Sequence, residues 1–144
     1  MRRWLAAGIL TSLVALAGTA AARGGQAAES PSKAIQSISW DAWLSAKVKA
    51  EENDAAGNFV AALQYYLEYA RQAQGLNNPA RVAWGKNNAA YMIIKMHRQD
   101  PTVDLAPAEK LLKEGLAVDG ATEECRKVLA MNLDYVRSVT GTPR

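Results

Sequence analysis

The 144-residue sequence has few of the groups that usually identify an enzyme or a disulfide-rich secreted domain. It contains one cysteine, Cys125, and one histidine, His97. A single thiol excludes an intramolecular disulfide, so the hydrophobic core must supply the stability alone. Neither residue has a second His or Cys nearby in sequence with which to build a metal site. We therefore expect no catalytic residue, no metal and no cofactor, and a buried, unreactive thiol at Cys125.

The chain also lacks a block of basic residues that could follow a phosphate backbone, which argues against a nucleic-acid partner. Its formal net charge is +3, from 17 Lys and Arg against 14 Asp and Glu. Arg2 and Arg3 lie in the apolar N-terminal segment, and without them the balance is 15 against 14. The basic character of the whole chain therefore depends partly on its first residues.

The N-terminal segment has the three-part layout of a secretory signal peptide. A short basic start, "MRRW", precedes the apolar run "LAAGILTSLVALAG", and small residues follow in "TAAA". Cleavage after Ala22 is predicted, which makes 1–22 a signal peptide and places the mature protein in the periplasm or outside the cell. Residues 23–38 are poor in large apolar groups and predict a flexible leader. Retention of the apolar run as a membrane anchor is the alternative, although it is short for a span of about 20 residues.

Residues 39–140 have a helical pattern throughout, followed by a short tail at 141–144. No segment alternates apolar and polar residues over a useful length, so we expect no sheet. Glycines, prolines and capping residues divide this domain into five predicted helices. They cover about 40–56, 58–74, 79–97, 105–118 and the stretch from the Thr122 cap to 139. The other predicted N-caps are Ser39, Asn58 and Asn78.

The second predicted helix, within "GNFVAALQYYLEYARQA", has one continuous apolar stripe. Its members are Phe59, Ala62, Leu63, Tyr66, Leu67, Ala70 and Ala73. Tyr65 and Tyr69 lie off this stripe, one turn apart. They are candidates for an exposed binding patch, because aromatic residues are enriched in interfaces. The alternative is that they pack against the leader or against a neighbouring helix, because the second helix of a solenoid repeat also touches the next repeat.

This second helix resembles part of a tetratricopeptide repeat (TPR). In "GNFVAALQYYLEYA", Gly57 matches the turn between the two helices of a repeat, and Phe59 matches the aromatic residue after it. Ala62 matches the small residue at which the helices approach, and Tyr66 matches the large packing residue one turn on.

The third and fourth helices extend the resemblance. In "WGKNNAAY", Trp84 and Tyr91 have the seven-residue separation of the bulky positions in the first helix of such a repeat. Ala108, Leu112 and Gly115 are then similar to a second helix. The resemblance covers about 40–139 and implies an all-α, antiparallel helix-hairpin solenoid, with about two TPR-like repeats and a C-terminal capping helix.

The spacing of an internal match is longer than is usual in this family. "NAAY" ends at Tyr91 and "NLDY" ends at Tyr135, which is 44 residues later, while Asn53 precedes Tyr91 by 38. The family repeat is about 34 residues. A lengthened loop around "RQDPTVDLA" accounts for the larger separation.

The resemblance implies a protein–protein interaction module that binds a partner protein or peptide in a groove lined by the first helices. One TPR subclass binds a C-terminal carboxylate there. Lys47 and Arg126 fit that pattern, but Glu51, Lys86 and Ala130 do not, and an acid at the centre repels a carboxylate. We therefore do not expect that ligand class. The candidate partner-binding residues are Lys47, Glu51, Lys86, Asn88, Ala89 and Arg126 in the groove, and Tyr65 and Tyr69 on the opposite surface.

Three asparagines lie among apolar neighbours and have two interpretations. Asn132 falls on the apolar side of its helix, where a buried amide needs a hydrogen-bond partner. Asn87 and Asn88 adjoin each other in the third helix. These amides either bond between helices or bind the backbone of a peptide, for which their paired donor and acceptor are suited.

Two other functions stay open from the sequence. One is a membrane-tethered assembly subunit that keeps its N-terminal helix. The other is a small exported enzyme, against which the single His, the single Cys and the missing acid–base pair argue. The sequence itself identifies neither the partner nor the oligomeric state.

Overall fold

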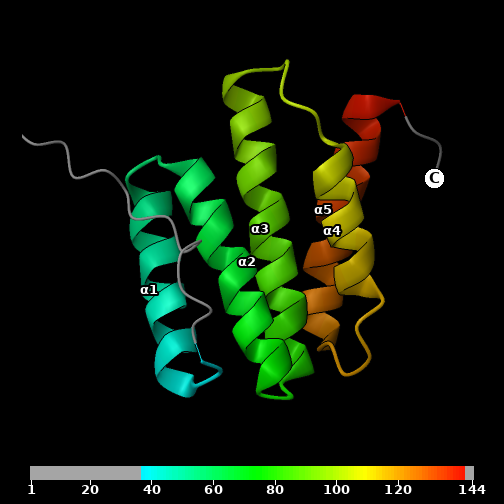
Figure 1. Ribbon diagram of the computed structural model, residues 1–144. Helices are drawn as coiled ribbons and strands as arrows, with labels where there is room; N and C mark the ends of the chain where they lie inside the picture. The colour runs from blue at the N-terminus through cyan, green and yellow to red at the C-terminus, as the bar shows by residue number, and fades with distance from the viewer. Residues whose placement is uncertain (1–36, 142–144) are drawn as a thin grey trace, which may run out of the picture.

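The computed structural model describes residues 37–141, which form five α-helices (Figure 1). The part of the chain that it describes contains no strand, so the predicted all-α class is confirmed. The predicted signal peptide and most of the predicted leader lie outside these residues. The helices are α1 (Trp40–Ala55), α2 (Phe59–Gly75), α3 (Pro79–Gln99), α4 (Ala106–Leu116) and α5 (Glu123–Thr140).

Three of the four predicted N-caps are confirmed by side-chain hydrogen bonds. Ser39 Oγ accepts from the backbone N–H of Ala42 at 3.0 Å, and Asn78 and Thr122 accept equivalent bonds at the starts of α3 and α5. Such caps satisfy N–H groups that have no partner within the helix. Asn58 occupies the predicted N-cap position of α2, but its side chain makes no capping bond.

Each helix packs against the next one along the chain, and α3 also packs against α5. Short connections favour antiparallel neighbours, so α1, α3 and α5 run in one direction and α2 and α4 in the other. Figure 1 shows α3 in the middle of the molecule, with α1 and α2 on one side and α4 and α5 on the other. This serial packing is compatible with a helical repeat fold.

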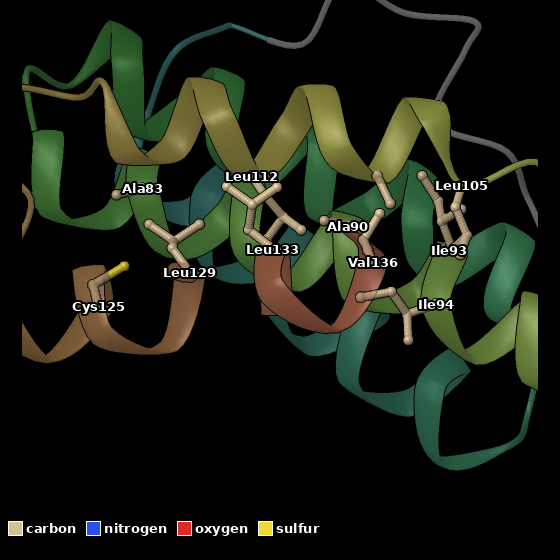
Figure 2. Close-up of a cluster of buried hydrophobic side chains, with 11 residues drawn as sticks. Ala83, Ala90, Ile93, Ile94, Leu105, Leu112, Cys125, Leu129, Leu133 and Val136 are labelled. Atoms are coloured by element: carbon tan, nitrogen blue, oxygen red, sulfur yellow. The ribbon is translucent and has the colours of Figure 1, made fainter. Parts of the chain in front are cut away.

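The interior has two parts. The aliphatic core lies between α3, α4 and α5, and Figure 2 shows its side chains gathered between these helices. Its buried members are Ala83, Ala90, Ile93, Ile94, Leu105, Ala108, Leu112, Cys125, Leu129, Leu133 and Val136. The alanine–tyrosine core lies between α1, α2 and α3. Its members are Ala50, Ala62, Tyr65, Tyr66, Ala89 and Met92.

The predicted stripe of α2 needs a correction. Tyr65 and Tyr69 lie off that stripe, yet they are only 6% and 7% exposed. Leu67 was placed on the stripe, but it is 41% exposed. The physical reason is that α2 packs against both α1 and α3, so the buried part of its surface is wider than one stripe and is rotated toward the tyrosines.

Helix α3 approaches α2 closely at Gly85. A Cβ atom added there would lie 2.7 Å from Cδ1 of Tyr69 and 2.8 Å from Cβ of Ala70. The absence of a side chain therefore permits this helix–helix contact. Within residues 37–141, no helix is both long enough and apolar enough to cross a membrane.

Candidate partner-binding surface

One side of α3 faces solvent between α1 and α5. Most of this helix is buried, but side chains that recur every three or four residues are partly or fully exposed. This spacing places them on one side of the helix. They are Arg81, Trp84, Asn88, Tyr91, Lys95 and Arg98. Together with Trp40, Trp43, Lys47 and Glu51 of α1 and Tyr135 of α5, they form what we call the odd-helix face.

At the N-terminal end of the odd-helix face, an arginine stacks on two tryptophans. The guanidinium carbon of Arg81 lies 4.0 Å from the ring centroid of Trp43 and 4.9 Å from that of Trp40. The two indoles meet edge to face at 5.9 Å, and Trp43 also contacts the buried ring of Tyr69 at 5.0 Å. These contacts join α1 to α3 and restrict the orientation of the guanidinium.

At the other end, two cations lie over tyrosine rings. Lys95 Nζ forms an ion pair of 2.5 Å with Asp54 of α1 and lies 5.1 Å from the Tyr91 ring. Arg98 lies 4.6 Å from the Tyr135 ring of α5, and its Nε donates to the hydroxyl of Tyr135 at 3.3 Å. The odd-helix face thus spans three helices, and noncovalent side-chain contacts between neighbouring helices connect them at both of its ends.

An amide network lies behind the middle of the face. The carboxamide of Asn132 in α5 donates to Asn87 Oδ1 at 2.9 Å, and Asn87 donates in turn to Asn88 Oδ1 at 3.2 Å. Asn87 and Asn132 are buried, so for these two the structure supports the inter-helix interpretation. The bond to Asn87 orients the Asn88 carboxamide, which is partly exposed on the odd-helix face.

The structure brings three of the six predicted groove residues to this face. Lys47 and Glu51 follow Trp43 by one and two turns of α1, and they pair with each other at 2.6 Å. Asn88 lies at the centre, on α3.

The other three predicted groove residues lie elsewhere. Ala89 is fully buried in the alanine–tyrosine core. Lys86 projects toward α4, where it pairs with Glu114 at 2.5 Å. Arg126 binds the end of α4, since its guanidinium donates to the carbonyl oxygens of Leu116, Val118 and Ala121 at 2.8, 3.0 and 3.3 Å. Sequence register alone did not show which side of α3 would be covered by α4.

The tyrosines proposed as an exposed patch contribute to the interior instead. Burial raises the pKa of Tyr69, and it is the main cause that raises the pKa of the neighbouring Tyr66 to about 12. Tyr65 lies with Tyr66 in the alanine–tyrosine core, and Lys49 of α1 is 5.5 Å from the Tyr65 ring. The structure therefore places these rings between helices.

Cys125 and His97 carry the most reactive side chains of the described region, and both lie in surroundings that suit a structural role. Cys125 is fully buried, and desolvation raises the pKa of its thiol, as is expected of an unreactive cysteine. His97 Nδ1 lies 2.7 Å from the carbonyl oxygen of Val103 and so connects the end of α3 to the following loop. Among residues 37–141, no three His, Cys, Asp or Glu side chains are grouped so that they could coordinate a metal ion.

A pocket of about 480 Å³ lies away from the odd-helix face, beside the turn between α2 and α3. Its polar lining consists of amides and the ammonium of Lys86, which already pairs with Glu114. Val82, Val118 and Pro79 form its apolar part.

Sequence analysis missed several residues of the odd-helix face, namely Trp40, Trp43, Arg81, Lys95 and Arg98. A signal for three of them was present. Trp84 and Tyr91 are seven residues apart, and continuing that spacing in steps of three and four reaches Arg81, Lys95 and Arg98. The two α1 tryptophans have no such signal, because the hydrophobic pattern of that helix is weak.

Comparisons of the chain with protein-family models, with curated proteins and with solved structures gave no match.

Proposed function

We propose that this chain is an exported, TPR-like interaction module that binds an extended segment of a partner protein on the odd-helix face. Export rests on the three-part N-terminal sequence, and the TPR-like character rests on the motifs around Gly57 and Trp84. The serial packing of five helices is compatible with a helical repeat fold.

The observation that carries the proposal is the row of side chains along α3. Aromatic rings and cations recur there at helical spacing, partly or fully exposed, and contacts with α1 or α5 hold the three cations Arg81, Lys95 and Arg98. Tyrosine, tryptophan and arginine are the residues enriched in protein interfaces and their energetic hot spots. Groups that are already ordered lose less conformational entropy when a partner binds.

The centre of the row suits a peptide backbone. Asn88 offers an amide donor and acceptor, and its orientation is set through Asn87 by α5. An extended segment with exposed N–H and C=O groups could form paired hydrogen bonds with such an amide. Trp84 and Tyr91 flank it and would contact the side chains of the segment.

Site-specific photo-crosslinking tests the proposal. A photoreactive amino acid would replace Asn88 on the odd-helix face or, as a control, Lys113 on α4, whose side chain is 55% exposed. In cells that export the protein, we expect a crosslinked partner band from position 88 and none from position 113. A partner that crosslinks only from position 113 would contradict the proposal.

The same cells test export. Mass spectrometry of the mature N-terminus should find Arg23 as the first residue. An intact first segment would instead support the membrane-tethered subunit.

A further inference from the structure

We infer that the odd-helix face selects an acidic segment, which it binds through carboxylates at two separate arginines, Arg81 and Arg98. This inference rests on the proposed function and specifies the chemistry of the partner. It predicts at least two acidic side chains in the bound segment, at a defined separation.

The two arginines differ from the others in the described part of the chain. Arg71 pairs with Glu68, Arg137 lies 3.8 Å from Glu109, and Arg126 donates to three backbone carbonyls. Among residues 37–141, neither Arg81 nor Arg98 has a carboxylate within ion-pair distance. They are therefore the two arginines of this region whose guanidinium groups can still pair with an added carboxylate.

Both guanidinium groups are nevertheless ordered by contacts. Arg81 stacks on Trp43 and Trp40, and its side chain donates no hydrogen bond to the described residues. Arg98 uses one donor on the hydroxyl of Tyr135 and lies over that ring. A guanidinium carries five N–H donors in a planar fork, which can bind both oxygens of a carboxylate. Stacking occupies a face of the group and leaves its hydrogen-bonding edges available.

The lysines of the same face are not equivalent. Lys47 is paired with Glu51 at 2.6 Å and Lys95 with Asp54 at 2.5 Å, so each already has an acid. A partner carboxylate would have to compete with these pairs. The uncompensated positive charge of the face is therefore concentrated at its two ends.

The separation of the two arginines sets the spacing of the acids. Arg81 and Arg98 are 17 positions apart on one helix, which at about 1.5 Å per residue corresponds to roughly 25 Å. An extended chain advances about 3.3 Å per residue, so this distance requires two acids about eight positions apart, with about seven residues between them. The intervening residues would pass over Trp84, Asn88 and Tyr91.

The two arginines, at opposite ends of the odd-helix face, should contribute differently to the binding affinity. Arg81 is in the first turn of α3 and stacks on Trp40, the first residue of α1, so it lies near two helix N-termini. These carry partial positive charge and favour an anion, whereas Arg98 is close to the partly negative C-terminus of α3. We expect the acid at Arg81 to contribute more to binding than the acid at Arg98.

Nuclear magnetic resonance with synthetic peptides tests the inference on the ¹⁵N-labelled mature chain. The main probe is an acetylated, amidated nine-residue peptide with Glu at its first and last positions and uncharged residues between. We expect it to shift the Arg81 and Arg98 Nε–H signals and the Trp43 indole N–H signal. The same peptide with Gln at both positions should bind about fivefold or more weakly. Equal affinity for the two peptides would overturn the inference.

Two further peptides test the spacing and the source of the carboxylate. A peptide with its two Glu residues three positions apart should shift the Arg81 signal alone, and shifts of both arginines would overturn the spacing. An uncharged peptide with a free C-terminal carboxylate has one anion only. If it bound as well as the two-Glu peptide, recognition of an acidic segment would be wrong.

Arginine variants complete the test. Arg81→Gln should weaken binding of the two-Glu peptide more than Arg98→Gln does, whereas Arg71→Gln on α2 is the matched control and should have no effect. Arg81→Lys retains a cation over the indoles but not the planar fork, so it provides a folded variant if Arg81→Gln loses its structure. Unchanged affinity in Arg81→Lys and Arg98→Gln would overturn the inference. Crosslinking from position 88 would persist in that case, which separates this failure from failure of the proposed function.

Discussion

The two halves of this molecule bury different kinds of side chain. The aliphatic core between α3, α4 and α5 is built from Leu, Ile, Val and Ala, together with one thiol. The alanine–tyrosine core between α1, α2 and α3 has small residues and tyrosines. Six of the eight exposed large apolar side chains also belong to the first half, since they precede residue 70. The first half thus leaves more large apolar side chains exposed to solvent than the second half does.

We propose that the first half contributes more to recognition and the second half more to stability. Enclosed aliphatic side chains contribute roughly 1.5–3 kcal/mol each before entropy is subtracted. The accessible rings of the odd-helix face, such as Trp40 and Tyr91, combine an apolar ring with a polar group, which suits them to a surface that binds a partner, whereas the tyrosines of the alanine–tyrosine core are buried. Helix α3 connects the two halves, because its buried residues belong to both cores. Its partly exposed residues form the proposed binding row, in which Trp84 and Tyr91 also pack against the aliphatic core.

The largest expected effect comes from the aliphatic core. Leu112 is fully buried between α4 and its neighbours (Figure 2), so Leu112→Ala should lower the free energy of unfolding by about 2–5 kcal/mol, because the lost contacts leave a cavity. Urea denaturation followed by circular dichroism measures this change. The control is Leu67→Ala, which removes the same atoms at a side chain that is 41% exposed and should cost far less. Similar losses in both variants would mean that the aliphatic core does not dominate stability.

The next effect tests the close approach of α3 to α2 at Gly85, in the half of the molecule that contains the alanine–tyrosine core. In Gly85→Ala, the new methyl group would meet the Tyr69 ring and the backbone of Ala70, whose Cα would lie 3.0 Å away. Overpacking of this kind costs about 1–3 kcal/mol, although alanine regains about 1 kcal/mol of helix propensity. We therefore expect a net loss of roughly 1–2 kcal/mol in urea denaturation.

Gly115→Ala sharpens this comparison within the aliphatic core. There the nearest atom is the terminal Cδ2 of Leu129, at 2.7 Å, which can rotate away more easily than a backbone. We expect Gly115→Ala to be less destabilising than Gly85→Ala. The reverse order would show that α2 and α3 do not depend on the glycine.

A third effect concerns the buried amides that join α3 to α5. Asn132→Ala should cost about 1–3 kcal/mol, since it leaves Oδ1 of the buried Asn87 carboxamide without its donor. The double variant Asn87→Ala/Asn132→Ala should cost less than the sum of the two single variants, because the interaction is lost only once. Additive costs in a thermodynamic cycle would show that the 2.9 Å bond contributes nothing to stability.

These comparisons also show what the sequence could predict. Five helices, three caps and the all-α class follow from local signals, since glycines, prolines and capping side chains act within a few residues of each helix end. The burial of Cys125 and Asn132 follows from the 3.6-residue period of α5. Such features need no knowledge of how the helices are arranged.

The residues of the odd-helix face were harder to predict, because they depend on which helix covers which side of α3. Lys86 and Arg126 have the pattern of solvent-facing groove cations, yet α4 lies close enough to bind both side chains. Arg81 has no motif of its own in the sequence, and only the stacking on Trp40 and Trp43 identifies it. The odd-helix face is formed by three helices that are far apart in sequence, so periodicity within one helix could not locate it.

The smallest effect is electrostatic and lies on α2. Arg71 pairs with Glu68 at 2.6 Å and is the main cause that lowers the pKa of Glu68. A carboxylate whose pKa is lower in the folded state stabilises the fold above its unfolded pKa of about 4.3, and this stability is lost as the pH falls through the folded value. Because the arginine is 44% exposed, solvent screens the pair, and Glu68→Gln should cost no more than about 1 kcal/mol at pH 7. Urea denaturation at pH 7 and at pH 3 measures this cost, which should shrink at the lower pH. A cost that stays constant between these pH values would show that the hydrogen bond from Gln72 to Glu68, at 2.9 Å, matters more than the charge.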